Sequence, residues 1–319
     1  MYLQLASKSF LHGLVCKKGN MTSHVIEGGA VSDDRASFTS LIKKSLPALP
    51  LMLVIGFFFL LPIARLVYVS FMSNEHTFTL SNFATAFKNP YRTGFLNSIK
   101  IGLLSAAIAA IPGAIAAYFI ETRGSSKLRR TIAVMSGVLA NTGGIPLAFM
   151  FYAALGTQGK LTQFIKYLGW DIYAGKFSLG SFVGLLIVYL YFQLPLMIIV
   201  FSPAIVSLRT EWSEAARNLG ANQFNYWLRI GFPLLFPSFI ASFLLLFASG
   251  FSAYATANAL TVGNLPLIPL QIGGLLDGNV SASQLNLGKA LGVVMIVISA
   301  LAVIPYLAIQ RRSARWQKR

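Results

Sequence analysis

The chain has few side chains that could carry chemistry, and their spacing does not assemble a catalytic or metal site. Its one cysteine, Cys16, excludes a disulfide framework and any site with several thiolate ligands. The three histidines, His12, His24 and His76, share no ligand spacing and lie outside the apolar segments. Those segments also lack the paired acids or histidines of a membrane-embedded enzyme. We therefore expect no enzymatic activity, no metal and no cofactor bound by this chain.

Three amides inside the apolar segments are the polar side chains that carry the most weight: Asn97, Asn141 and Gln193. An amide that lacks a partner in hydrocarbon is costly, whereas Ser and Thr can bond to their own helix backbone. We expect the three amides to line a solvated translocation path. Prolines within the same segments predict kinked helices that bend around such a passage: Pro62, Pro112, Pro146, Pro195 and Pro305.

The composition predicts a polytopic membrane protein. Of the 319 residues, 55% are hydrophobic and 11% are charged, and the mean hydropathy is +0.67. A soluble domain carries about 25% charged residues. Six apolar runs are each long enough to cross about 30 Å of hydrocarbon as a helix. They lie near 48–72, 96–120, 131–155, 179–206, 233–257 and 287–309.

The expected fold class is therefore all-α, a polytopic membrane helical bundle with six transmembrane helices. We expect three regions along the chain. Residues 1–46 form a polar cytoplasmic tail that is disordered, residues 47–310 form the transmembrane domain, and residues 311–319 form a basic cytoplasmic tail. The tail lacks the pattern of a cleavable signal peptide, and Met21 is as plausible a start as Met1.

The net charge of +17 reflects membrane topology. Eighteen of the 26 Lys and Arg residues fall in the two tails and in the second and fourth connections, against five in the other connections. By the positive-inside rule, both termini and these connections are cytoplasmic. This distribution argues against a nucleic-acid partner and for the lipid bilayer.

The fourth connection, residues 210–222, predicts a helix, a sharp turn and a second short helix. Thr210 is a plausible N-cap, and acids follow it in the first turns. Gly220 supplies a left-handed helix stop, and Asn222 can cap the second helix before Pro233 opens the next span. Such a segment fits a passive amphipathic elbow on the membrane surface and a docking element for another protein equally well.

The spacing in this connection resembles the EAA motif of ABC importer permease subunits, which reads E-A-A-x3-G-x9-I-x-L-P. The matching residues are Glu214, Ala215, Ala216, Gly220, Ile230 and Pro233. Phe232 departs from the pattern by replacing Leu. The chain is similar to type I importer permeases from about residue 46 to 316, and to their spermidine/putrescine-type branch through the stretches 141–146 and 191–196. That branch also has relatives for iron, thiamine and aminophosphonate.

The resemblance implies a bacterial inner-membrane subunit whose coupling helix lies between spans four and five. It implies two ABC ATPase subunits, a second permease that is often a paralogue, and an extracytoplasmic solute-binding protein. The chain itself lacks a G-x-x-x-x-G-K-[ST] phosphate loop, so ATP would be used by a partner subunit. The coupling residues would be those of the motif.

The substrate follows from the resemblance alone, which implies a polyamine. The outer connections carry three acids, Glu75, Asp171 and Asp277, against five Lys and Arg, a balance that does not favour polyamines over an anion or a zwitterion. The alternatives from a different class are a secondary carrier, a membrane enzyme and a channel. A secondary carrier predicts buried charges and inverted repeats, which the sequence lacks.

Overall fold

The computed structural model describes residues 49–316 except 74, 76, 176, 209 and 278–283, and describes Leu49 and residues 311–316 by their backbone alone. The expected tail at residues 1–46 lies outside the described residues. Two compact units divide the chain, one ending at Gly56 and one beginning at Phe57. The described part of the first unit is essentially the helix α2 (Leu49–Ile55).

The second unit is built of helices, and its described residues form no strand beyond an isolated bridge between Met72 and Phe78. After the π-helical turn η2 (Gly56–Leu60), the elements are α3 (Leu61–Ser70), α4 (Ser81–Ala86), α5 (Tyr91–Arg123), α6 (Ser126–Asn141), α7 (Ile145–Leu155), α8 (Lys160–Tyr167), α9 (Phe182–Val206), α10 (Thr210–Asn218), α11 (Gln223–Tyr226), the π-helical turn η3 (Trp227–Gly231), α12 (Phe232–Ser252), α13 (Ala255–Thr261), α14 (Ile268–Leu276) and α15 (Leu285–Trp316).

Five of the six expected spans are confirmed as continuous apolar helices in the described part of the chain. They run over Pro50–Ser70, Tyr91–Arg123, Phe182–Val206, Gln223–Ser252 and Leu285–Gln310. The last helix, α15, continues to Trp316, into the region expected to be a tail. The all-α membrane bundle predicted from the composition is therefore confirmed.

The expectation of one uninterrupted third span over 131–155 is wrong. The chain breaks after α6, and α7 and α8 turn 99° away from it. Gly144 has φ +78° and ψ −151°, a conformation for which glycine is suited, and Pro146 lies in the first turn of α7 instead of inside a helix. With 16 residues, α6 is about 24 Å long, shorter than the hydrocarbon core.

Prolines shape several of the other helices. Pro112, Pro195 and Pro305 lie inside α5, α9 and α15, as expected. Both π-helical turns directly precede a helix with proline in its first turn, Pro62 after η2 and Pro233 after η3. A π-helical turn widens the helix locally where proline can neither donate a hydrogen bond nor avoid the preceding turn.

The core of the second unit is the packing of α5 against α9 and α12. Small residues let these helices approach closely. A Cβ atom on Gly102 would lie 3.1 Å from the Phe251 backbone nitrogen, and one on Gly113 would lie 2.7 Å from the Met197 Cβ. The remaining long helix, α15, packs against α12, α3 and α14.

The ends of the broken helices are held by side chains from distant segments. Tyr189 donates to the Ala253 carbonyl between α12 and α13 at 3.2 Å, and Asn97 donates to the Pro266 carbonyl before α14 at 3.1 Å. The Ile268 N–H donates to the Ser98 hydroxyl at 2.9 Å. Backbone groups freed by a break need such partners within a membrane, so these bonds stabilise the irregular segments.

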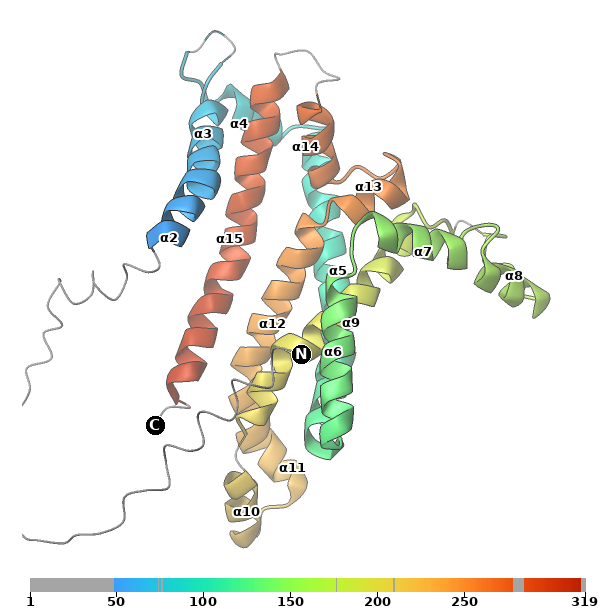
Figure 1. Ribbon diagram of the computed structural model, residues 1–319, viewed down its shortest axis with the longest axis vertical. Coiled ribbons are helices and arrows are strands. Elements are labelled where there is room, and N and C mark those ends of the chain that lie inside the picture. Colours follow the sequence, from blue (N-terminus) through green and yellow to red (C-terminus); the bar gives the residue numbers. More distant parts are fainter. Residues whose placement is uncertain are drawn as a thin grey trace, which may run out of the picture. The chain divides into compact units, whose positions relative to one another are not determined.

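The second unit has two distinct ends (Figure 1). At one end lie α10, α11 and the connection from α5 to α6, and at the other lie α4 and α14. The helices α7 and α8 project sideways from the end of α6 that lies away from α10. The second and fourth connections therefore lie at one end of the bundle and the first and fifth at the other, in agreement with the two sides expected for them.

Candidate functional site: the elbow and the path amides

The elbow, defined as residues 210–226, begins with the helix α10 and its two exposed acids. Glu211 and Glu214 are both exposed, and α10 carries the acid Glu211 in its first turn and the base Arg217 in its last turn. Both charges suit the helix dipole. Ala215 is exposed, whereas Ala216 is only 7% exposed and packs inside the chain. The two alanines of the motif are thus divided between the surface and the interior.

Gly220 ends α10 in the conformation expected from the sequence. Its φ is +78°, in the left-handed region. The Ala221 N–H donates to the Ala216 carbonyl and the Gly220 N–H to the Arg217 carbonyl, both at 2.9 Å. These two bonds form a Schellman motif, which satisfies the last carbonyls of α10. An added Cβ on Gly220 would meet no atom of the described residues within 4 Å, so the need for glycine here is conformational.

The second half of the elbow leads directly into the next span. Asn222 caps α11, because its side-chain oxygen accepts a hydrogen bond from the Asn225 N–H at 2.8 Å. The helix then continues through η3, which contains Ile230, into α12, where Pro233 lies in the first turn. The capping by Asn222 and the position of Pro233 are as expected. A movement of the elbow would therefore be transmitted along one continuous helix.

Two large apolar side chains stand out from the elbow into solvent. Leu219 is 88% exposed and Phe224 is 71% exposed. They flank Gly220 on either side of the turn. The sequence analysis did not single them out as site residues, although an apolar residue beside a predicted glycine turn, within a polar connection, is a signal that could have been used. Exposed apolar groups among charged ones are typical of a protein-binding surface.

The three path amides do not gather in one place. Asn97 lies on α5, is half-buried and bonds to the loop before α14. Asn141 ends α6, is exposed and donates to the Gly137 carbonyl at 2.8 Å. Gln193 lies on α9 with no exposed surface. Their common role as the lining of a path stays a prediction.

Gln193 lies where α5, α9 and α12 meet. Its Nε2 donates to the Ser105 hydroxyl at 3.0 Å and to the Leu246 carbonyl at 3.4 Å, while its Oε1 is buried without a hydrogen-bond partner among the described residues. Sequence reasoning missed Ser105, because it gave weight only to the amides within the apolar segments. Ser105 does donate to the Gly102 carbonyl at 3.2 Å, but it also accepts from Gln193.

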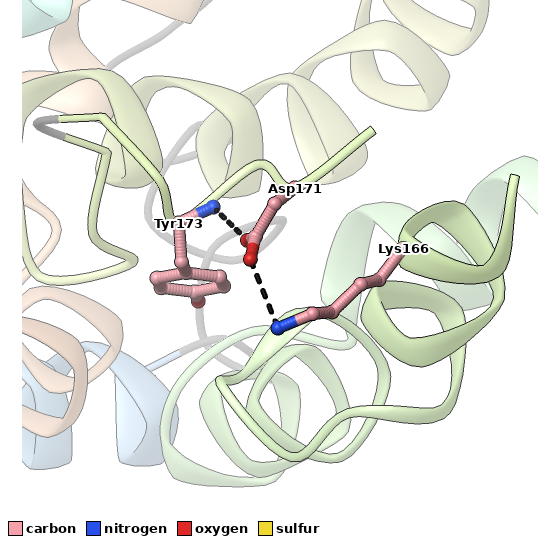
Figure 2. A network of polar contacts seen from close by, with 3 residues as sticks. All are labelled: Lys166, Asp171 and Tyr173. Atoms are coloured by element: carbon pink, nitrogen blue, oxygen red, sulfur yellow. Dashed lines mark hydrogen bonds and ion pairs between the residues drawn. The ribbon is translucent and has the colours of Figure 1, made fainter. Parts of the chain in front are cut away.

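A second polar cluster holds the segment between α8 and α9 (Figure 2). Lys166 and Asp171 form an ion pair at 3.0 Å, and the Tyr173 N–H donates to Asp171 at 3.0 Å. The hydrogen bond from Lys166 lowers the pKa of Asp171, and the Tyr173 N–H acts in the same direction. The Tyr173 hydroxyl, whose pKa is raised by burial, donates to the Leu155 carbonyl at 2.6 Å. The cluster ties the segment to the end of α7.

Comparison with known proteins decides the family. The sequence pattern of the binding-protein-dependent transport system inner membrane components matches residues 110–319. The chain belongs to this family. Its members are membrane permeases of ABC importers, so the chain is a permease subunit of the inner membrane and not an enzyme. Family membership also decides against the secondary carrier, the membrane enzyme and the channel.

Among curated relatives, this permease is similar to the spermidine/putrescine transport system permease protein PotB of Haemophilus influenzae. The two are 27% identical over 262 residues, which cover 78% of this chain and 88% of the relative. PotB of Escherichia coli is 24% identical and covers 78% and 91%. The probable sulfate transport system permease protein of Prototheca wickerhamii is 25% identical over 209 residues, which cover 65% and 78%.

Solved structures confirm the fold of the permease. A bacterial alginate ABC transporter, in complex with its alginate pentasaccharide-bound periplasmic protein, matches with a TM-score of 0.65 and 16% identity over 88% of this chain and 98% of that chain. The structure of a bacterial ABC transporter that imports alginate matches with a TM-score of 0.62 and 17% identity, over 87% and 98%. The expected type I importer permease fold agrees with both.

Proposed function

We propose that this permease forms half of the translocation pathway of a polyamine importer and couples to a separate ATPase through the elbow. A paralogous permease forms the other half, and an extracytoplasmic solute-binding protein delivers the substrate. Both termini and the elbow face the cytoplasm. The observation that carries the coupling role is the elbow itself, a capped and sharply turned pair of helices on which Leu219, Phe224 and Glu214 are all exposed.

The surface of the elbow favours a protein groove over a membrane surface as its partner. Glu211, Glu214 and Arg217 are exposed on α10, and charged groups are costly in hydrocarbon. Leu219 and Phe224 are exposed at the turn that follows α10, where their contact with water is unfavourable. A groove on a soluble ATPase subunit can bury the two apolar side chains and leave the acids at its polar rim. ATP-driven closure of the ATPase would then move the elbow and the helix that continues into α12.

The orientation is supported by the charges at the two ends of the bundle. Basic residues cluster on the elements at the elbow end, where Arg123 ends α5, Lys127, Arg129 and Arg130 lie in the first turns of α6, and Arg229 lies in η3. The positive-inside rule assigns this end to the cytoplasm. A reporter that is active only in the cytoplasm should therefore be active when it is fused to the C-terminus.

The polyamine assignment is supported by the two PotB relatives at 27% and 24% identity. A polyamine cation can pass neutral and aromatic groups through hydration and cation–π contact. The second candidate substrate is an oxyanion, favoured by the relative named as a probable sulfate permease at 25% identity and by the excess of basic residues in the outer connections. Aminophosphonate, thiamine and ferric iron are further substrates of the resembled branch.

The experiment that tests this function uses the permease purified with the subunits that accompany it, reconstituted in nanodiscs. We expect an ATPase subunit to co-purify, and its ATP hydrolysis to rise when the cognate solute-binding protein is added with spermidine or putrescine. Sulfate in place of the polyamine is the matched substrate control. Stimulation by sulfate alone would transfer the assignment to the oxyanion, and a permease that co-purifies with no ATPase would overturn the coupling role.

A further inference from the structure

An apolar groove lies beside the elbow, between the last turns of α5 and the start of the helix that leads into α12. Its volume is about 470 Å³. The walls come from Tyr118 and Phe119 of α5, Trp227 of η3, and Phe232 and Phe236 of α12, together with aliphatic residues of α5 and Phe201 of α9. We call it the α5–α12 groove. Its lining consists of aromatic and aliphatic side chains, so it suits a hydrocarbon chain.

The charged group that contacts the groove wall lies at the end where α5 stops. Arg123 is the last residue of α5, is exposed, and holds its guanidinium 5.5 Å from the centroid of the Phe119 ring. A cation at the C-terminus of a helix also interacts favourably with the helix dipole, but this interaction does not determine where the guanidinium lies. The contact with Phe119 fixes its place, because Phe119 is part of the groove wall.

Two amphipathic side chains contribute their rings to the groove wall. The Tyr118 and Trp227 rings meet edge to face at 5.0 Å, and both side chains are half-buried. Among the described residues, neither the Tyr118 hydroxyl nor the Trp227 indole N–H donates a hydrogen bond. Tyr and Trp with an apolar body and an available polar tip are typical of the membrane interface, where the tip meets lipid headgroups.

We infer that the α5–α12 groove binds one anionic phospholipid. An acyl chain occupies the aromatic and aliphatic walls, to which Tyr118 and Trp227 contribute their rings, and Arg123 pairs with the negative headgroup. Charge complementarity selects this occupant over an apolar helix from another subunit, since such a helix would offer no negative group to Arg123 beside the Phe119 wall. The proposal needs only that the chain spans a membrane, so it stands independently of the substrate and of the coupling role.

The test compares lipids on the full chain, purified with whatever subunits accompany it and analysed by native mass spectrometry. Phosphatidylglycerol and phosphatidylcholine with identical acyl chains are the two probes. One arginine near a surface favours an anionic lipid by about fivefold, so we expect phosphatidylglycerol to be retained about fivefold more than phosphatidylcholine. Arg123→Gln should bring the ratio close to one, while Arg130→Gln, a matched loss of charge on the same connection, should leave it unchanged.

A second variant tests whether an acyl chain occupies the groove. Ala114 lines the groove, and Ala114→Phe places a ring inside it, so both lipids should be lost from the chain. Equal yield and equal co-purification of subunits show that the variant has folded. The proposal is overturned if the two lipids bind equally to the wild type, if Arg123→Gln keeps the preference, or if Ala114→Phe retains the lipid. Photo-crosslinking from the position of Ile115 to another subunit instead of to lipid would also overturn it.

Discussion

Gly144 and Thr256 are joined by two hydrogen bonds across 112 residues of sequence. The Gly144 N–H donates to the Thr256 hydroxyl oxygen at 2.7 Å, and the hydroxyl lies 3.4 Å from the Gly144 carbonyl, to which it donates in turn. One side chain thereby satisfies both backbone groups of the residue at which the third span breaks. It also fixes that break to α13, which begins just after α12 ends.

We expect Thr256→Val to destabilise this junction. Valine keeps the shape of threonine but removes the hydroxyl, which leaves the half-buried Gly144 N–H without its partner. The cost should be about 1 to 2 kcal/mol. The measurement is the thermal unfolding temperature of the purified transporter, with Thr256→Ser as the control that keeps the hydroxyl. An unfolding temperature equal to that of the wild type in Thr256→Val would show that the break is held by packing alone.

The ion pair between Lys166 and Asp171 should persist at any pH near neutrality. Because the pKa of Asp171 is lowered from its ordinary value of 3.8, its stabilising contribution is fully present above that value and is lost as the pH falls through the still lower value in the folded protein. Hydrogen exchange at the Tyr173 amide, which donates to Asp171, reports the loss. We expect its protection to be constant from pH 8 to about pH 4 and to fall only below that range.

Asp171→Asn is the matched variant for this prediction. It keeps an acceptor for the Tyr173 N–H but removes the charge that pairs with Lys166. We therefore expect the Tyr173 amide to be less protected from hydrogen exchange than in the wild type, and its protection not to change as the pH falls below about 4. A wild-type protein that lost protection between pH 5 and pH 7 would contradict the lowered pKa.

Cysteine accessibility should distinguish the three path amides. In a Cys16→Ser background, Asn141→Cys should react with a small polar thiol reagent in the resting transporter, because Asn141 is exposed at the end of α6. Gln193 has no exposed surface, so Gln193→Cys should react only while ATP and the loaded solute-binding protein drive the transport cycle. Asn97→Cys, at a half-buried position, should react at an intermediate rate. Gln193→Cys that stays inert during turnover would place Gln193 off the path.

Much of the fold could be predicted because hydrophobic length is a strong signal in a membrane protein. Helices of more than 20 apolar residues have one stable arrangement in hydrocarbon, and five of them formed as expected. The prediction of a continuous third span was wrong because the apolar run continues through the break. The composition of 131–155 fits a single helix, but Gly143, Gly144 and Pro146 allow a turn that costs little where Thr256 supplies the partners.

The elbow could be predicted in more detail than the path. Its turn, cap and helix ends are local, and Gly220 and Asn222 encode them within a few residues of sequence. The environment of Gln193 depends instead on Ser105 and Leu246, 88 and 53 residues away. No periodicity in one sequence shows which small residues of α5 will face α9, so the burial of Gln193 could not be derived.

Gly220 offers a direct test of the coupling role of the elbow. Gly220→Val should abolish stimulation of ATP hydrolysis by the loaded solute-binding protein, while the permease stays inserted in the membrane. The reason is conformational, because the space around Gly220 is open but its φ of +78° is strained for a β-branched residue, by about 1 to 2 kcal/mol or more. The Schellman bonds from Gly220 and Ala221 would then open, and Leu219 and Phe224 would lose their relative placement.

Gly220→Asn is the matched control, since asparagine tolerates the left-handed region, and it should retain most of the stimulation. Ala215→Trp and Ala216→Trp extend the test. Ala215 is exposed, so a bulky side chain there should block the ATPase subunit in a pull-down without unfolding the elbow. Ala216 is buried, so the same change should disrupt α10 itself and expose it to proteolysis. If Gly220→Val kept wild-type stimulation and wild-type pull-down, the elbow would be a passive connector, and coupling would have to pass through another cytoplasmic surface of the permease.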